Sequence, residues 1–258
     1  MTTVLAGFRD GWIVTRRNLL RYMRLPQLVV ISSIQPIMFL TLFNFVFGGA
    51  IGATVAGSGP YINFLLPGIL VQTILFGSLQ TGVGLSRDLN AGIIDRFRSL
   101  PMSRSAVLTG RTSADIIRSS LVAMILLAMG YVYGFRFQNG AGNAVMMIAL
   151  ILAFGYAFSW IAAFVGLAVK DEETAQLAGF LFIFPLTFAS ATFVPTATIS
   201  PWLQVFANNQ PVTFAVTAAR HFALGTPSGG AEWKLLAWIV GILLVFIPLS
   251  IYSYKKRS

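Results

Sequence analysis

Six long apolar stretches constrain this chain more than any other feature of its sequence. They cover residues 28–47, 62–84, 116–135, 144–169, 177–194 and 235–254. An α-helix rises about 1.5 Å per residue, so about 20 residues cross the ~30 Å hydrocarbon core of a bilayer. The stretches are continuously apolar, whereas the strands of a membrane barrel alternate apolar and polar residues. The pattern predicts an all-α membrane protein with six transmembrane helices in a lipid bilayer.

The overall composition agrees with this interpretation. Hydrophobic residues make up 56% of the chain and charged residues only 10%, whereas a soluble domain carries about 25% charged residues. The chain has no cysteine, which excludes disulfides and thiolate metal sites. Its net charge of +10 does not indicate nucleic-acid binding, because the basic residues flank apolar stretches instead of forming one stripe. We expect residues 1–258 to form a single membrane domain.

Basic residues are unequally divided between the connections. Fifteen of the eighteen Lys and Arg residues lie before the first stretch, between the second and third, between the fourth and fifth, or in the C-terminal tail. Cytoplasmic connections carry the excess of positive charge in membrane proteins. Both termini are therefore predicted to be cytoplasmic, in agreement with an even number of spans.

Two cytoplasmic segments have amphipathic patterns. In residues 1–27, apolar residues recur at helical spacing among arginines, which predicts an amphipathic helix in the membrane interface. A plain basic anchor is the alternative. In residues 86–104, charged residues alternate with apolar ones until Pro101 blocks helix continuation. This second segment is predicted to be a short helix that binds a partner or, equally well, one that packs on its own bundle.

The connection at residues 195–233 is predicted to lie outside, yet it is rich in apolar residues. Pro195, Pro201 and Pro211 interrupt it. We expect two short helices that dip back toward the membrane as a re-entrant segment, where irregular backbone must pack against protein or line a cavity.

The sequence lacks the groups that most catalytic and ion-coupled mechanisms need. The predicted spans carry no ionisable side chain away from their ends, which argues against a proton- or sodium-coupled pump, although sites built from carbonyl groups remain open. His221 is the only histidine, and no lysine follows a glycine as a phosphate-binding loop requires. The chain is therefore not predicted to be an enzyme by itself, and we expect no catalytic residue, metal site or cofactor in it.

Polar and aromatic residues inside the spans have two interpretations each. Gln72 and Gln80 in the second span are typical of hydrogen bonds between helices, but they could also meet a substrate. Phe184 and Phe188 belong to a phenylalanine-rich fifth span. These rings could face lipid or other helices, or they could form a soft wall for a hydrophobic substrate.

Two motifs resemble a known family. Residues 87–103 read RDLNAGIIDRFRSLPMS, and residues 209–213 read NQPVT, followed by Arg220 and Gly225. Both motifs, together with the predicted layout, resemble the permease subunits of ABC-2 type exporters, and within them the daunorubicin-resistance-like permeases of bacteria. The likeness covers nearly the whole chain.

The resemblance implies a fold, partners and a location. The fold would be that of the ABC-2, or type V, exporters, in a bacterial inner membrane. A second permease chain, the same or similar, would complete the membrane part. Two cytoplasmic ATPase subunits would bind ATP and Mg²⁺. The substrate would be a hydrophobic or amphipathic drug, lipid or glycoconjugate.

The resemblance also implies site residues. Residues 86–104 would form the coupling helix that docks on the ATPase. Its coupling residues would be Asp88, Gly92, Ile93, Ile94, Asp95, Arg96, Phe97, Leu100 and Pro101. The second and fifth spans would line the substrate path, with Gln72, Phe76, Gln80, Phe184 and Phe188. An ion-coupled transporter and a membrane scaffold without transport are the alternatives.

Overall fold

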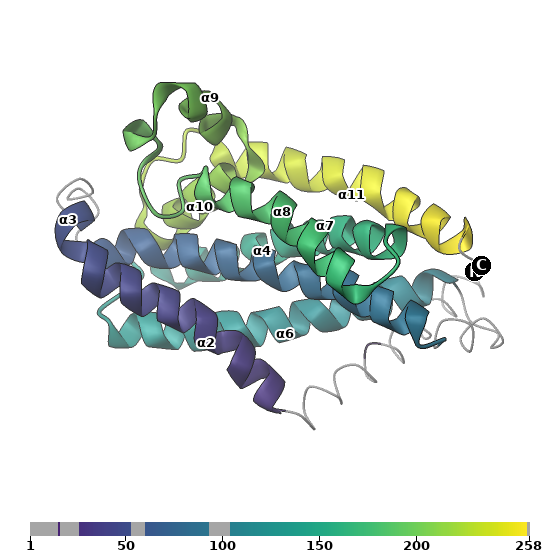
Figure 1. Ribbon diagram of the computed structural model, residues 1–258. Coiled ribbons are helices and arrows are strands. Elements are labelled where there is room, and N and C mark those ends of the chain that lie inside the picture. The colour runs from purple at the N-terminus through teal and green to yellow at the C-terminus, as the bar shows by residue number, and fades with distance from the viewer. Residues whose placement is uncertain (1–14, 16–25, 53–59, 93–103, 257–258) are drawn as a thin grey trace.

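The chain folds as a bundle of long helices (Figure 1). The computed structural model describes Thr15 and residues 26–52, 60–92 and 104–256, and these residues contain no strand. The helices are α2 (Pro26–Leu42), α3 (Gly48–Gly52), α4 (Tyr61–Asn90), α6 (Arg104–Val132), α7 (Gly140–Ala168), α8 (Glu172–Phe188), α9 (Pro201–Asn209), α10 (Pro211–Leu224) and α11 (Ala231–Lys256). A π-helical turn, Phe43–Phe47, joins α2 to α3. The predicted all-α class is confirmed for these residues.

Five of the described helical segments are long and apolar enough to cross a membrane. They are Val30–Phe47, Tyr61–Asn90, Leu108–Val132, Gly140–Ala168 and Ala231–Tyr254. The predicted span at residues 177–194 corresponds to α8, which has only 17 residues. A multi-pass membrane protein is therefore supported, and the count of six spans stays a prediction.

Helix α4 is the centre of the bundle. It makes its most extensive contacts with α7, and it also packs against α6, α8, α10 and α2. Most of its residues are buried on every side, as expected of a helix that is apolar all round. Side chains on α4 are therefore positioned by five neighbouring helices.

Two glycines allow α4 and α7 to approach closely. A Cβ atom on Gly82 would overlap the carbonyl oxygen of Ala162, and a Cβ atom on Gly166 would overlap the carbonyl oxygen of Gly82. Small residues at such crossings let helix backbones come into van der Waals contact, which drives association in a membrane. A close backbone contact thus lies near the C-terminal ends of α4 and α7.

Helix α4 extends further at its C-terminal end, and α6 further at its N-terminal end, than the predicted spans. Helix α4 continues to Asn90 instead of residue 84, and α6 begins at Arg104 instead of residue 116. The charged residues in these extra turns bond to the neighbouring helix: Arg111 Nη1 lies 2.6 Å from Asp88 Oδ2, and Thr81 Oγ1 donates to Asp115 Oδ2 at 2.7 Å. Polar groups whose hydrogen bonds are satisfied in this way can lie within a helix beyond the point where composition alone would predict its end.

Helix α8 is displaced toward the N-terminus relative to its prediction. It begins directly after Asp171, whose side chain accepts a hydrogen bond from the Thr174 N–H at 2.7 Å as an N-cap. It ends at Phe188, six residues before the predicted 194. Side chains from the outer segment satisfy the backbone near this end: Gln210 Nε2 donates to the Leu186 carbonyl at 2.9 Å.

The outer segment at residues 195–233 contains two short helices, as expected from its prolines. Helix α10 begins with Pro211, is capped by the Gln210 side chain, and ends at Gly225, whose φ of 75° suits glycine. Helix α10 packs against α4, α7 and α11, and most of its residues are buried. Insertion of this segment into the membrane stays a prediction.

Two predicted elements lie largely outside the described residues. Of the interface helix at residues 1–27, the structure describes Thr15 and the last two residues; Thr15 Oγ1 donates to the Gly110 carbonyl on α6 at 3.2 Å. Of the predicted coupling helix at residues 86–104, residues 86–90 are the end of α4, and residues 93–103 lie outside the description.

Candidate functional site

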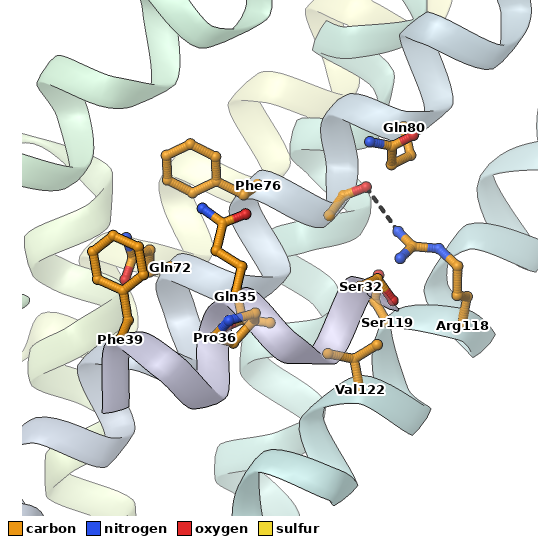
Figure 2. A pocket seen from close by; sticks show the side chains of 12 residues that line it. Ser32, Gln35, Pro36, Phe39, Gln72, Phe76, Gln80, Arg118, Ser119 and Val122 are labelled. Atoms are coloured by element: carbon orange, nitrogen blue, oxygen red, sulfur yellow. Dashed lines mark hydrogen bonds between the residues drawn. The ribbon is translucent and has the colours of Figure 1, made fainter. Parts of the chain in front are cut away.

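A polar pocket lies among the otherwise apolar membrane helices α2, α4 and α6. Its volume is about 120 Å³. Figure 2 shows its side chains converging from the three helices. The lining residues are Ser32, Gln35, Pro36 and Phe39 from α2, Gln72, Thr73, Phe76, Gly77 and Gln80 from α4, and Arg118, Ser119 and Val122 from α6.

The α4 wall of the pocket follows from helical spacing. Gln72, Phe76 and Gln80 are four residues apart, so they lie on one face of the helix. Gln72 is buried, whereas Gln80 and, across the pocket, Gln35 are exposed at the surface of the bundle. Both exposed glutamines belong to helices long enough to cross the membrane. The pocket therefore reaches the surface of the bundle between polar side chains of two candidate membrane-crossing helices.

Arg118 supplies the only positive charge in the pocket lining. Only 6% of its surface is exposed, and its Nη2 donates to the Gly77 carbonyl at 3.0 Å. A Cβ at Gly77 would lie in ordinary contact with Arg118 Nη2, at 3.4 Å, and in tight contact with Ser119 Oγ, at 3.1 Å. In the part of the chain that the structure describes, the buried Nε of Arg118 has no hydrogen-bond partner.

An aromatic row extends from the pocket along α8. The ring centroids of Phe76 and Phe180 are 5.2 Å apart, those of Phe180 and Phe184 are 6.4 Å apart, and those of Phe184 and Phe188 are 4.3 Å apart. The three α8 rings are also exposed on the surface of the bundle. Each is thus both a packing partner and part of an apolar outer face.

The structure brings part of the predicted substrate path together. Gln72, Phe76 and Gln80 line the pocket. Phe184 and Phe188 do not line it. Ring contacts connect them to it through Phe180 and Phe76, and a second series runs from Phe188 through Phe193 and Phe43 to Phe39. The assignment of these five residues to substrate stays a prediction.

Sequence reasoning missed the contributions of α6 and α2 to this pocket. The third apolar stretch begins at residue 116, so the sequence alone places Arg118 near the start of a span. In the structure Arg118 lies ten residues after Leu108, where the α6 segment that is long and apolar enough to cross a membrane begins. Gln35 could have been found as an amide in the middle of an apolar stretch, but nothing in the sequence pairs it with Arg118.

The C-terminal end of α4 carries two consecutive ion pairs. Arg87 Nη2 lies 2.6 Å from Glu172 Oε2 at the start of α8, and Asp88 pairs with Arg111 on α6. The carboxylate of Glu172 is held charged by this bond, which lowers its pKa below the usual 4.5. One short segment is thus tied to both α8 and α6.

Only two of the predicted coupling residues fall within the description. Asp88 is buried and points toward Arg111, so the described contact is with its own bundle. Gly92 has a φ of 66°, which turns the chain after α4. Ile93, Ile94, Asp95, Arg96, Phe97, Leu100 and Pro101 lie outside the described residues.

The described residues offer no alternative metal chemistry. They contain no cluster of three His, Asp or Glu side chains that could hold a metal ion. His221 Nδ1 lies 2.7 Å from the Thr226 carbonyl oxygen, a local contact at the end of α10. The polar pocket and the ion-paired end of α4 are therefore the features that a function must explain.

Comparison with known proteins identifies the family. The ABC-2 type transporter family matches residues 9–224. The chain is 29% identical over 257 residues to the daunorubicin resistance ABC transporter permease protein DrrB1 of Streptomyces coeruleorubidus, covering all of this chain and 88% of that one. It is 27% identical over 259 residues to the doxorubicin resistance ABC transporter permease protein DrrB of Mycobacterium tuberculosis, covering 95% and 87% of the two chains.

A third relative, also from Mycobacterium tuberculosis, is named "Probable doxorubicin resistance ABC transporter permease protein DrrC". It is 31% identical over 246 residues, which cover 95% of this chain and 87% of that one. The chain belongs to the ABC-2 type transporter family and is the membrane permease subunit of an ABC exporter.

Proposed function

We propose that this permease moves a hydrophobic or amphipathic molecule, such as a drug, a lipid or a glycoconjugate, out of the cytoplasm or the inner leaflet. A separate ATPase that binds ATP and Mg²⁺ powers the movement. The observation that carries this proposal is the polar pocket with exposed glutamines at membrane depth. The names of the relatives, which refer to daunorubicin and doxorubicin resistance, support a drug-like substrate.

The exposed glutamines favour a transport path over a simple structural role. An amide that faces hydrocarbon without a hydrogen-bond partner is costly, by about 2–7 kcal/mol depending on the reference state. Gln35 and Gln80 are both exposed at the open side of the pocket. This side therefore faces something polar, which we take to be a path for water and substrate, shared with a second permease chain.

Coupling to the ATPase would act through the end of α4. The stretch that follows it, including Ile93 and Phe97, is proposed to dock on the ATPase as a coupling helix. Arg87 and Asp88 tie α4 to α8 and α6 at the base of this stretch. Because α4 and α6 both line the pocket, a displacement of the coupling helix would reach the pocket through them. ATP would shift the inward- and outward-open populations by binding one of them more tightly.

The proposed assembly has two permease chains, identical or similar, and two ATPase subunits in a bacterial inner membrane. Both termini of the permease would be cytoplasmic. This topology requires α8 as the sixth span. It places α9 and α10 in a re-entrant outer segment.

The decisive experiment is co-purification of the permease with the ATPase encoded beside its gene, followed by transport in proteoliposomes. Ile93→Asp with Phe97→Asp is expected to abolish the complex while the permease still inserts. Exposed Lys170→Gln, on another cytoplasmic connection, is the control that should retain it. Transport by the wild type should require ATP. Gradient-driven transport without any ATPase would overturn the proposal in favour of an ion-coupled transporter, and binding without transport would favour a scaffold.

A further inference from the structure

The charge of Arg118 requires a counterpart that the described residues do not provide. Arg118 lies ten residues, or roughly 15 Å along the helix, beyond Leu108, the first residue of the α6 segment that is long and apolar enough to cross a membrane. Charged side chains within membrane-crossing segments are costly and usually mark a path for ions or substrates. In the part of the chain that the structure describes, no carboxylate lies within ion-pair distance of Arg118, and the buried Asp115 accepts from Thr81 instead. One carbonyl, that of Gly77, is its only hydrogen-bond acceptor there.

The geometry of the pocket suits an anion. The guanidinium group is a planar fork that binds carboxylate or phosphate through two parallel hydrogen bonds. Its Nε is buried and has no hydrogen-bond partner among the described residues, and Arg118 is one of the residues that line the pocket. A volume of about 120 Å³ exceeds that of a small polar group, since one water occupies about 30 Å³ in the liquid. Gln72 and Ser119 add uncharged donors to the same lining.

The neighbouring surface suits an apolar tail. The pocket opens beside Phe76, and from there the exposed rings of Phe180, Phe184 and Phe188 continue along α8. A molecule with its charged end at Arg118 could therefore lay its hydrocarbon part on this row. A free anion would not need these rings, whereas an amphiphile would use both features.

We propose that the pocket binds the anionic headgroup, phosphate or carboxylate, of an amphipathic molecule, with Arg118 as counter-ion and the α8 phenylalanines as the tail-binding surface. This inference deepens the proposed function and rests on it for the role of the site in transport. The ligand would be either the exported substrate or a phospholipid of the surrounding membrane, because both present the same chemistry.

Binding can be measured on the full permease–ATPase complex in detergent by isothermal titration with short-chain lipids. Dioctanoyl phosphatidic acid is expected to bind saturably, and dioctanoyl phosphatidylcholine, which has the same tails and no net charge, is expected to bind much more weakly. Arg118→Gln should weaken the binding of phosphatidic acid by at least about tenfold, the loss expected for one charge-assisted hydrogen bond. Arg118→Lys keeps the positive charge but lacks the planar guanidinium group. Its affinity for phosphatidic acid should therefore lie between those of the wild type and Arg118→Gln.

Two further variants separate binding from folding. Val122→Phe fills the pocket while leaving Arg118 in place, and it should also weaken binding. Arg136→Gln removes an exposed arginine elsewhere on the bundle and should bind phosphatidic acid like the wild type. Equal affinity of a folded Arg118→Gln complex, or equal affinity for phosphatidylcholine, would overturn the proposal. Binding of inorganic phosphate as tight as that of phosphatidic acid would overturn its amphiphile part.

Transport in proteoliposomes then distinguishes the two sources of the ligand. It also tests the proposed function separately from headgroup binding. ATP-driven movement of labelled phosphatidic acid that is lost in Arg118→Gln would make the ligand a substrate. Binding without movement, while a hydrophobic drug is still exported, would make it a resident lipid. Absence of all ATP-driven transport, with binding intact, would overturn the proposed function and leave the headgroup site standing.

Discussion

Arg220 on α10 binds Phe64 on α4 in two ways at once. Its Nε donates to the Phe64 carbonyl at 2.9 Å, and its guanidinium carbon lies 3.4 Å from the centroid of the Phe64 ring. Its Nη2 also donates to the Thr192 carbonyl at 3.1 Å. This one buried side chain therefore joins the outer helix α10 to the central helix and to the turn after α8.

Replacing Arg220 should destabilise the outer half of the bundle. Arg220→Met keeps much of the apolar stem but leaves two buried carbonyls without a charged donor, so we expect a loss of about 3 kcal/mol in the free energy of unfolding. Arg220→Lys should not restore stability, because a single ammonium group cannot reproduce the planar fork and the contact with the ring. Unfolding in mixed micelles with increasing SDS measures this free energy. Lys170→Met, at an exposed lysine, should change it by less than about 0.5 kcal/mol, and an equal loss in both variants would contradict the expectation.

A single methyl group between α4 and α7 should be poorly tolerated. In Gly166→Ala the new Cβ would overlap the backbone of Gly82, which cannot rotate away as a side chain can. Overpacking of this kind costs about 1–3 kcal/mol, so the melting temperature of the purified permease should fall.

Gly241→Ala on α11 is the matched control for that substitution. No atom lies within 4 Å of a Cβ built at Gly241, and alanine favours helix over glycine by about 1 kcal/mol. This variant should melt at or above the wild-type temperature. A Gly166→Ala variant as stable as Gly241→Ala would mean that the two helices are not in close contact in the membrane.

Apolar length alone predicted the positions of the most hydrophobic helices. The predicted span at residues 144–169 nearly coincides with α7, Gly140–Ala168. The i, i+4 spacing of Gln72, Phe76 and Gln80 sets their common face on α4 in the same way. Both are local properties, since they depend only on residues close in sequence.

The rest of the site could not be predicted, because it depends on contacts between distant segments. In the sequence, the charged boundary of a span is indicated by Arg111, Asp115 and Arg118. Helix α6 nevertheless includes these three residues, because they bond to residues on α4. Their partners are, in the same order, Asp88, Thr81 and Gly77. Composition shows that burying a charged side chain is costly, but it does not identify the residue that will pair with that side chain. The pocket is formed by residues from α2, α4 and α6 that meet only in the folded bundle.

The Asp88–Arg111 pair should behave as a coupled unit. Its side chains are only 10% and 14% exposed, and breaking a buried pair leaves an uncompensated charge that costs about 3–5 kcal/mol. Asp88→Asn and Arg111→Gln should each destabilise the permease strongly, whereas the double variant should lose much less than the sum of the two. A double-mutant cycle on the free energy of unfolding measures the difference. Additive losses would show that the two residues act independently.

The neighbouring Arg87–Glu172 pair should make the spacing of α4 and α8 depend on pH. The hydrogen bond from Arg87 lowers the pKa of Glu172 below its usual value of 4.5. The stabilisation is therefore fully present above pH 4.5, and it is lost as the pH falls through the lowered pKa and the carboxylate is protonated. Both side chains are more than a third exposed, so high salt should weaken the pair as well.

Spin labels can report this spacing, because the chain contains no native cysteine. Labels at Asn90→Cys and Gln176→Cys, both exposed positions, should give a narrow distance distribution at pH 7 that broadens well below pH 4.5. Glu172→Gln should broaden the distribution at every pH, because no titratable partner for Arg87 remains at that position. Glu173→Gln changes the adjacent carboxylate, which forms no ion pair with Arg87 among the described residues, and it should leave the wild-type response intact. A distribution in Glu172→Gln that stays narrow at pH 7 would show that the pair does not hold the two helices together.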